Sequence, residues 1–250
     1  MKAVPLAPLF LEVGRFFEIF GRVLLWTPRP PYDLRQLVRQ MVRVGVDSLP
    51  VVLLTALFTG MVMALQTFAT LKRVNAEGFV GTLVALSMVR ELSPVISSLL
   101  IAGRCGSAMG AELGTMRVTE QIDALEVLAT DPVHYLMVPR VWATVLMLPL
   151  LIVFADVVGI VGGYLISVVY FGANPVTYME NSFRFMDWDD VTSGLIKAAV
   201  FGGIIAVVGC QKGYFTRGGA EGVGRSTTRA VVLASIAILI SDFFLTKILY

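Results

Sequence analysis

Five stretches of this chain are long and apolar enough to cross a lipid bilayer, and this limits its fold more than any other feature. A transmembrane helix needs about 20 mostly apolar residues. The expected spans cover residues 48–71, 78–114, 141–171, 191–211 and 227–247. Only 15% of the residues are charged and 56% are hydrophobic, whereas soluble domains carry about 25% charged residues. We therefore expect an all-α integral membrane protein with a single domain over residues 1–250.

The second span carries a charged pair in its middle. Residues 78–89 and 92–103 are uncharged, and Arg90 and Glu91 separate them within one long tilted helix. Adjacent residues of a helix point about 100° apart, so these two side chains are not expected to pair with each other. Pro94 has no N–H to donate to the carbonyl of Arg90, so the helix should be loosened at this turn.

Lysine and arginine are distributed unequally between the two sides of the membrane that the spans define. Fourteen of them lie at the N-terminus and around the loops after spans two and four, and four lie on the opposite side. Because cytoplasmic loops carry the excess of positive charge, we expect a cytoplasmic N-terminus and a C-terminus outside the cytoplasm. The outer loop of residues 174–190 is acidic.

Residues 1–46 precede the five-span bundle of residues 47–250 and are expected to form cytoplasmic or interfacial helices. Residues 10–26 have the spacing of an amphipathic helix with a broad apolar side. Such a helix can lie in the membrane interface. Packing of this helix on its own protein is the alternative.

A second N-terminal helix is expected to begin at Asp33. It carries a basic stripe at steps of four, formed by Arg35, Arg39 and Arg43. This stripe suits phospholipid headgroups, and an ordinary solvated face explains it equally well.

Motifs for catalysis, metal binding or nucleotide binding are missing from the sequence. The glycine cluster at 218–224 is not followed by Gly-Lys-Ser/Thr, and no serine stands in a Gly-x-Ser-x-Gly elbow. His134 has no cysteine or acidic cluster at ligand spacing, so it is interpreted as a solvated or structural residue. Cys105 and Cys210 show no metal or disulfide pattern. The net charge of +2 is too small to indicate nucleic-acid binding.

Charged side chains inside membrane spans are costly and therefore usually functional. Arg90, beside the carbonyl that Pro94 leaves without a donor, suits an aqueous or headgroup-binding cavity; snorkelling to the outer interface is the alternative. Lys197 lies about two turns into span four and either faces the same cavity or snorkels. For Asp156 and Asp242 we expect structural hydrogen bonds within the bundle.

The loop between spans two and three is expected to contain a short amphipathic helix over residues 120–129, which Asp131-Pro132 ends. Such a helix can dock into a groove of a partner protein. Resting on the membrane is the alternative, which its acids disfavour because the inner leaflet is anionic. Its apolar side consists of Ile122, Leu125 and Leu128, and its acidic side of Glu120, Asp123 and Glu126. Small residues that let helices approach closely precede it at Ala102, Gly106, Gly110 and Gly114.

Three stretches resemble the MlaE/YrbE family of permeases. They are ALFTGMVMALQ at 56–66, VRELSPVISSLLIAGRCGSAMGAELGTMRVTEQIDALEVL at 89–128, and GGAEGVGRSTTRAVV at 218–232. Together they span most of residues 47–248 and are specific in combination. Cys105 departs from the pattern, because a small aliphatic residue is expected there.

The resemblance implies a subunit of an ATP-driven lipid transporter. Such permeases form homodimers that hold lipid in a cavity between the two copies. They bind cytoplasmic ATPase subunits, which carry the ATP, a mammalian-cell-entry-type substrate-binding protein on the outer face, and in some systems a small cytoplasmic accessory subunit. The chain itself would need no cofactor and would be no enzyme. Phospholipid is the expected substrate and the inner membrane the expected location.

The resemblance also assigns roles to residues of this sequence. Arg90 and Glu91 match the polar pair of the lipid path, to which Lys197 is added from its place in span four. The helix at 120–129 matches the coupling helix that sits in the ATPase, with candidate contacts at Glu120, Gln121, Asp123, Leu125 and Glu126.

Two other classes of function stay open. An ion-coupled secondary transporter would use Asp156, Glu91 or Asp242 as ion sites and would need no ATPase. A membrane scaffold without transport would tolerate loss of Arg90 and Glu91. Co-purification of a nucleotide-binding subunit separates the first alternative from the permease.

Overall fold

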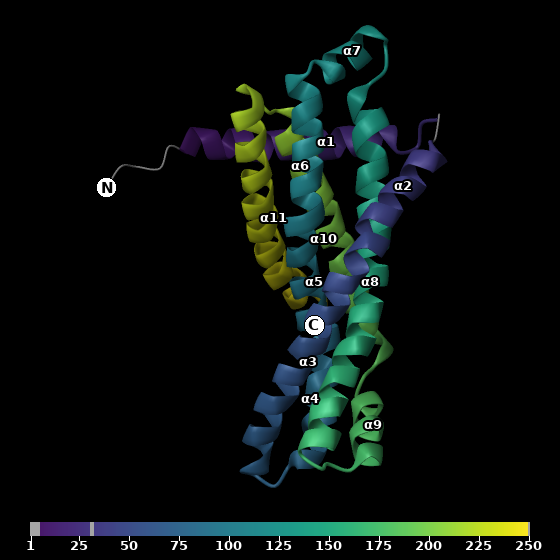
Figure 1. Ribbon diagram of the computed structural model, residues 1–250, viewed down its shortest axis with the longest axis vertical. Coiled ribbons are helices and arrows are strands. Elements are labelled where there is room, and N and C mark those ends of the chain that lie inside the picture. The colour runs from purple at the N-terminus through teal and green to yellow at the C-terminus, as the bar shows by residue number, and fades with distance from the viewer. Residues whose placement is uncertain (1–5, 31–32, 250) are drawn as a thin grey trace, which may run out of the picture.

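The computed structural model describes residues 6–30 and 33–249, and all regular structure in these ranges is helical. Five helical runs are long and apolar enough to cross a membrane, as expected (Figure 1). They cover Leu34–Lys72, Glu77–Val118, Val133–Tyr170, Trp188–Tyr214 and Gly219–Leu249. The prediction of an all-α membrane protein is therefore confirmed.

The first two spans are assembled from shorter helices. Span one joins α2 (Leu34–Val44) to α3 (Leu49–Lys72), and the Asp33 side chain caps α2 by accepting a hydrogen bond from the Gln36 N–H at 3.0 Å. Span two is continuous, as expected, but contains two π-helical turns. Its parts are α4 (Val80–Ser87), the Arg90 π-turn (Met88–Leu92), α5 (Ser93–Ile101), the Arg104 π-turn (Ala102–Gly106) and α6 (Ser107–Val118).

The Arg90 π-turn has its cause in the sequence. Because Pro94 cannot donate to the carbonyl of Arg90, an α-helical turn would leave that carbonyl without a partner. The helix widens here instead, and the Ser93 N–H bonds the carbonyl of Met88, five residues back. π-turns of this kind occur often at functional sites.

The remaining spans begin earlier than expected. Span three starts at Val133 and continues through α8 (Val138–Tyr164) to Tyr170. It starts early because the Asp131 carboxylate accepts the Val133 N–H at 2.8 Å and so caps the helix. Asp131, expected only to end the loop helix, therefore also begins span three. The last two spans are α10 (Trp188–Tyr214) and α11 (Gly219–Leu249). The outer loop between spans three and four contains an additional helix, α9 (Pro175–Arg184), which the sequence analysis did not predict.

Helix α10 is the centre of the bundle. In its most apolar stretch, 56% of α10 is buried inside the protein, whereas the corresponding stretch of α11 is only 11% buried. Glycines allow this close packing: a Cβ at Gly202 would lie 2.8 Å from the carbonyl oxygen of Thr144, and one at Gly209 would lie 2.9 Å from that of Gly106. The small-residue stripe of span two therefore does pack closely against a neighbouring helix, as expected.

Helix α1 (Leu6–Trp26) crosses the bundle at the end of the molecule where the loop helix α7 (Gln121–Val127) lies (Figure 1). Ile19 and Val23 are buried against the bundle, whereas Phe17 and Leu25 are 63% and 64% exposed. One side of α1 thus packs on its own protein, and another offers apolar surface. An interfacial position stays a prediction that this arrangement suits.

Ion pairs tie α1 to α10 and to the residues just before span three. Glu12 pairs with the buried Lys212 of α10, and Arg22 pairs with Asp131 at 2.9 Å. Burial alone would raise the pKa of Asp131, but the hydrogen bonds from Arg22 and from the Val133 N–H outweigh it, and the pKa falls below that of an ordinary aspartate.

Candidate functional site

Charged residues from three spans meet beside the Arg90 π-turn. We call this group the Arg90 cluster; it consists of Arg90 and Glu91 from span two, Asp190 and Lys197 from α10, and Asp242 from α11. The cluster contains two cations and three carboxylates, so it carries a charge of −1 if every member is ionised.

Lys197 is the buried centre of the cluster, with 0% of its surface exposed. Its Nζ lies 2.8 Å from Glu91 Oε1 and 3.2 Å from Asp242 Oδ1. It also donates to Thr246 Oγ1 at 2.8 Å and to the carbonyl of Arg90 at 3.1 Å. The carbonyl of Arg90, to which Pro94 cannot donate, therefore does receive a cation. That cation is Lys197 and not Arg90 itself. The alternative that Lys197 snorkels to an interface is wrong.

Arg90 is held by a buried carboxylate. Its Nε and Nη2 lie 2.7 and 2.6 Å from Oδ1 of Asp190, which is 2% exposed. The other oxygen of Asp190 accepts the backbone N–H of Asp187 and completes a capping box at the start of α10. Asp190 thus fixes both the helix start and the Arg90 side chain. The prediction that Arg90 and Glu91 do not pair with each other is consistent with these separate partners.

Sequence reasoning placed Asp190 only in an acidic outer loop and missed its role. The signal was present, because Asp187 and Asp190 stand three residues apart just before an apolar run, which is a capping pattern. What the sequence did not contain was the pairing of Asp190 with a residue 100 positions earlier.

Two intramembrane carboxyls were expected to make structural hydrogen bonds. Asp242 forms an ion pair with Lys197, although its Oδ1 makes no hydrogen bond within the described part of the chain. Asp156 interacts through its carboxyl with the Ser93 side chain, but its buried Oδ1 likewise has no hydrogen-bond partner there. It lies in an apolar groove of about 560 Å³ formed by α8, α9 and the start of α10.

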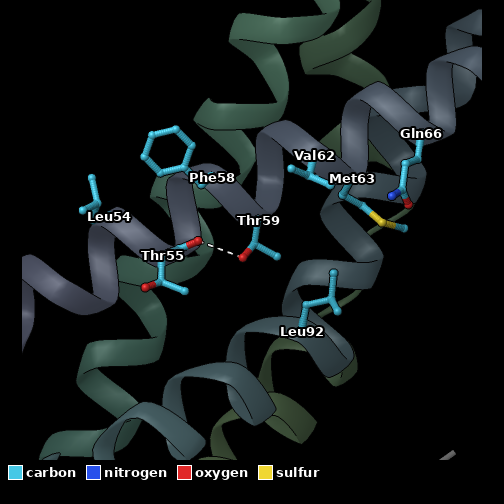
Figure 2. A pocket seen from close by; sticks show the side chains of 8 residues that line it. All are labelled: Leu54, Thr55, Phe58, Thr59, Val62, Met63, Gln66 and Leu92. Carbon is cyan, nitrogen blue, oxygen red and sulfur yellow. Dashed lines mark hydrogen bonds between the residues drawn. The ribbon is translucent and has the colours of Figure 1, made fainter.

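An apolar groove adjoins the Arg90 cluster. Figure 2 shows it running along α3 and closed on one side by Leu92, the residue after Glu91. Its volume is about 520 Å³. Thr55 and Thr59 direct their hydroxyls to the carbonyls of Val51 and Thr55, both at 2.8 Å, so they are satisfied within the helix. The lining residues are Leu54, Thr55, Phe58, Thr59, Val62, Met63, Gln66 and Leu92.

The arrangement of groove and cluster is amphipathic. Arg90 and Glu91 keep 39% of their side chains exposed, while their counter-charges Asp190 and Lys197 are buried. An apolar groove close to two exposed charges of fixed position can hold a molecule that has a hydrocarbon part and a polar part. Lys197 reaches such a molecule only through Glu91.

The loop helix is shorter than expected. Glu120, at φ 59°, and Ala129, at φ 56°, have left-handed backbones and lie outside α7. Gln121 bonds the Thr119 hydroxyl at 3.0 Å and is exposed. Ile122 is buried and Leu125 is partly buried against the core.

The two sides of α7 also differ from the expectation. Leu128 does not continue the buried side but is 73% exposed, and Val127 is 87% exposed. Asp123 pairs with Arg117 at 2.6 Å, and Glu126 accepts a hydrogen bond from the Tyr214 hydroxyl at 3.1 Å. The free surface of this helix is therefore an apolar C-terminal tip, with Glu120 exposed at the other end, more than an acidic stripe.

Within the described ranges, no group of three or more His, Cys, Asp and Glu side chains is arranged to hold a metal ion. The imidazole of His134 lies 3.1 Å from the carbonyl of Arg29 and 5.0 Å from the ring of Trp26. These contacts agree with a structural role. Cys105 and Cys210 are both buried and free.

Comparisons with known proteins agree with the arrangement of the five spans. A probable ABC transporter permease protein of Rickettsia typhi is 46% identical over 242 residues, which cover 96% of this chain and 93% of that protein. The intermembrane phospholipid transport system permease protein MlaE of Haemophilus influenzae is 40% identical over 243 residues, covering 96% and 93%. Protein TRIGALACTOSYLDIACYLGLYCEROL 1, chloroplastic, of Arabidopsis thaliana is 42% identical over 232 residues, covering 93% of this chain and 66% of that one.

The family comparison gives the same result over most of the chain. The family described as Permease MlaE matches residues 37–248, from α2 to the last turn of α11. Two of the three relatives above are named as permeases, which are transport subunits and not enzymes. The chain is therefore a multi-pass membrane protein that belongs to the MlaE permease family.

Proposed function

We propose that this permease moves phospholipid as the membrane subunit of an ATP-driven transporter, with lipid held between two copies of the chain. The observation that carries the proposal is the apolar groove on α3, whose lining includes Leu92, together with the exposed side chains of Arg90 and Glu91 just before Leu92 in the same π-turn. A phospholipid has the matching parts, two acyl chains and a charged headgroup. The relative from Haemophilus influenzae is named for intermembrane phospholipid transport.

Arg90 is the proposed contact for the headgroup phosphate, and Glu91 positions the neighbouring polar groups. A guanidinium can bind phosphate through two parallel hydrogen bonds. Because the Arg90 cluster has a net charge of −1 when fully ionised, its overall charge does not attract an anion. Recognition of phosphate must therefore come from the guanidinium itself, and the nearby Glu91 favours headgroups that also carry an amine.

Substitution of Arg90 tests the lipid contact. Arg90→Ala should lower ATP-driven lipid transport in proteoliposomes by about tenfold or more, because a charge-assisted contact is lost. Arg90→Lys should recover only part of the rate, since an ammonium lacks the planar fork. Arg184→Ala, which removes an arginine from α9, is the matched control. Full transport by Arg90→Ala would end the proposed contact, and transport that persists without an ATPase would favour the ion-coupled alternative.

The exposed tip of α7 is the proposed docking point for the cytoplasmic ATPase. Val127 and Leu128 are exposed apolar residues at the C-terminal end of a short helix, and Glu120 is exposed at its N-terminal end. Changing Val127 and Leu128 to Asp should detach the ATPase in co-purification while the permease stays folded. Reversing the charge at Glu120, Asp123 and Glu126 should uncouple ATP hydrolysis from transport. Glu221→Lys, in the glycine-rich segment, is the control and should retain the ATPase.

The proposed orientation places α7 and the N-terminus in the cytoplasm and the C-terminus in the periplasm of an inner membrane. A cysteine at position 185 should then react with an impermeant thiol reagent added from outside, and one at position 221 should not. The native cysteines are both buried and give little background. The opposite labelling pattern would invert the orientation and place α7 where there is no ATP.

The remaining partners follow from the same family membership. We propose that a mammalian-cell-entry-type protein binds the outer face and that a small accessory subunit joins the ATPase. Co-purification of the intact complex from native membranes, followed by mass spectrometry of its subunits, tests both.

A further inference from the structure

Helix α2 presents two exposed stripes of opposite character. The apolar residues Leu34, Val38 and Val42 are 68%, 56% and 44% exposed. A basic stripe runs beside them, formed by the exposed residues Arg35, Arg39 and Arg43. An amphipathic helix of this kind lies with its apolar stripe in lipid and its cations among phosphate headgroups.

The basic stripe leads to a small pocket between α2 and the Arg104 π-turn. The pocket has a volume of about 240 Å³, and its polar lining comes from Gln40, Arg43, Asp47, Arg104 and Glu112. Two arginines therefore face one cavity from two different spans. Their side chains are accessible, with 52% of Arg43 and 41% of Arg104 exposed.

Most contacts of Arg104 are to neutral groups. Its Nη1 donates to the carbonyl of Arg43 at 2.9 Å and to the Ser48 hydroxyl at 2.6 Å. Its nearest carboxylate, Asp47, is 3.9 Å away and 50% exposed. The side chain is thus oriented by neutral acceptors, and its charge is only weakly compensated.

The charge balance around the pocket is positive. Glu112 is shared between Arg43 and the buried Arg140, whose Nη2 lies 3.0 Å from Glu112 Oε2. The pocket lining alone contains two arginines and two carboxylates and is neutral. Arg140, which does not line the pocket, also pairs with Glu112, so the group that includes Arg140 carries a charge of +1. This sign is opposite to that of the Arg90 cluster and favours an anion.

We propose that this pocket binds the phosphate of a membrane phospholipid whose acyl chains lie along the apolar stripe of α2. Arg43 and Arg104 would grip the phosphate, as guanidinium groups do in bidentate pairs. The pocket is distinct from the Arg90 cluster, because Arg104 lies 14 residues along span two, or about 21 Å at helical rise. The role of the pocket as a second headgroup site on the transport route rests on the proposed function, whereas the binding itself does not.

The experiment measures lipid binding by the full-length protein in detergent, using native mass spectrometry and dioleoylphosphatidylglycerol as the probe. The Arg90→Ala variant is the parent, so that binding at the Arg90 cluster does not contribute. In this background, Arg43→Gln with Arg104→Gln should weaken binding by about tenfold or more, since two charge-assisted contacts are lost. Arg225→Gln, on α11 away from the pocket, should bind as the parent does.

A second variant covers the case in which the double substitution does not fold. Ala108 lines the pocket and is exposed, so Ala108→Glu adds a negative charge while both arginines stay in place. Binding should fall as in the double variant, and Ala108→Gln, of nearly equal size, should lose much less. Unchanged binding in Ala108→Glu would overturn the proposal.

Two further probes test whether the pocket recognises the whole phospholipid, its acyl chains alone or its phosphate alone. Dioleoylglycerol has the chains without the phosphate and should bind weakly and without sensitivity to these substitutions. Glycerol 3-phosphate has the phosphate without the chains and should bind far more weakly than the lipid. Equal binding of dioleoylglycerol, or equal binding of glycerol 3-phosphate, would overturn the assignment to a phospholipid. A different result would refute the proposed function: the unmodified protein, together with its ATPase, would transport no lipid even if the pocket binds phospholipid.

Discussion

The two π-turns of span two carry similar residues but hold them in opposite ways. At the Arg90 π-turn, the partners of the exposed charges are buried, with Asp190 2% and Lys197 0% exposed. At the Arg104 π-turn, the guanidinium bonds a carbonyl and a hydroxyl, and its nearest carboxylate is half exposed. The net charges also differ, −1 around Arg90 and +1 around Arg104.

The difference shows that one helix can combine a polar site of fixed geometry with a polar site whose partners can be exchanged. A buried ion pair is rigid, because removing one partner strands the other charge in a poor solvent. An exposed arginine with neutral partners can exchange them for an incoming anion at little cost. The Arg90 cluster is therefore built to keep its geometry, and the Arg104 pocket to bind and release.

The largest effect is expected at the centre of the rigid site. Lys197→Met should destabilise the protein by about 3–5 kcal/mol, because Glu91 and Asp242 lose their shared cation. The midpoint of thermal unfolding in detergent measures this loss. Adding Glu91→Gln and Asp242→Asn should recover most of it, while Lys247→Met, at an exposed lysine, should change little. An unchanged midpoint for Lys197→Met would show that the cluster is not the rigid site described above.

A smaller effect is expected at Glu112, on the Arg104 side. Glu112→Gln leaves the buried Arg140 with the carbonyl of Leu136, 2.6 Å from its Nη1, as its remaining close acceptor. The expected cost is about 1–3 kcal/mol, the range for a polar group left poorly satisfied. Glu221→Gln, which breaks an exposed pair with Arg225, is the control for the same chemical change. A loss as large as that of Lys197→Met would erase the contrast between the two sites.

Ser48→Ala tests whether Arg104 is held loosely. The substitution removes one of three neutral acceptors of Arg104 and should cost about 0.5–1.5 kcal/mol. The carbonyl of Arg43 remains as a partner at 2.9 Å. Thermal unfolding of Ser48→Ala beside Ser107→Ala, whose hydroxyl bonds only the backbone of its own helix, measures the difference. A cost of several kcal/mol would mean that Arg104 is as rigidly fixed as Arg90.

The smallest effect is expected at the Arg22–Asp131 pair, an accessible ion pair outside the spans. The folded protein lowers the pKa of Asp131, so the pair stabilises the protein above the ordinary aspartate pKa of about 4. That contribution is lost as the pH falls through the lower folded value. Because the pair is part-exposed, it should amount to at most about 1 kcal/mol. The difference in unfolding midpoint between the unmodified protein and Asp131→Asn should be constant from pH 6 to 8 and shrink at about pH 4 and below. A difference that does not change with pH down to about pH 2, or that grows as the pH falls, would contradict the lowered pKa.

Much of the fold was predictable because hydrophobicity and loop charge act locally. All five spans were expected, and those of α3 and α10 are correct to within three residues. Errors occurred where polar residues continue a helix, as at Val133 and Gly219, since an apolar pattern ends there while the backbone hydrogen bonds do not. Helix α9 was missed for the same reason, although Asn174 caps it through the Val176 N–H.

The candidate site was predicted in part. Arg90, Glu91 and Lys197 stood out because charges are rare within spans, and the structure brings all of them together. Their partners Asp190 and Asp242 could not be assigned, because each pairing joins residues of two different spans and depends on how the spans pack.

The amino-acid sequence was enough to predict the number of spans, the irregular turn before Pro94 and the presence of intramembrane charge, since each follows from local hydrophobicity or from a missing N–H. Which charges neutralise one another depends on the tertiary structure and could not be predicted from the sequence. Lys197 can be buried completely because the Arg90 π-turn aims a carbonyl and the Glu91 carboxylate at it, and α11 brings the Asp242 carboxylate within 3.2 Å. The cost of burying a charge depends on such partners, and partners from distant segments exist only once the helices have packed.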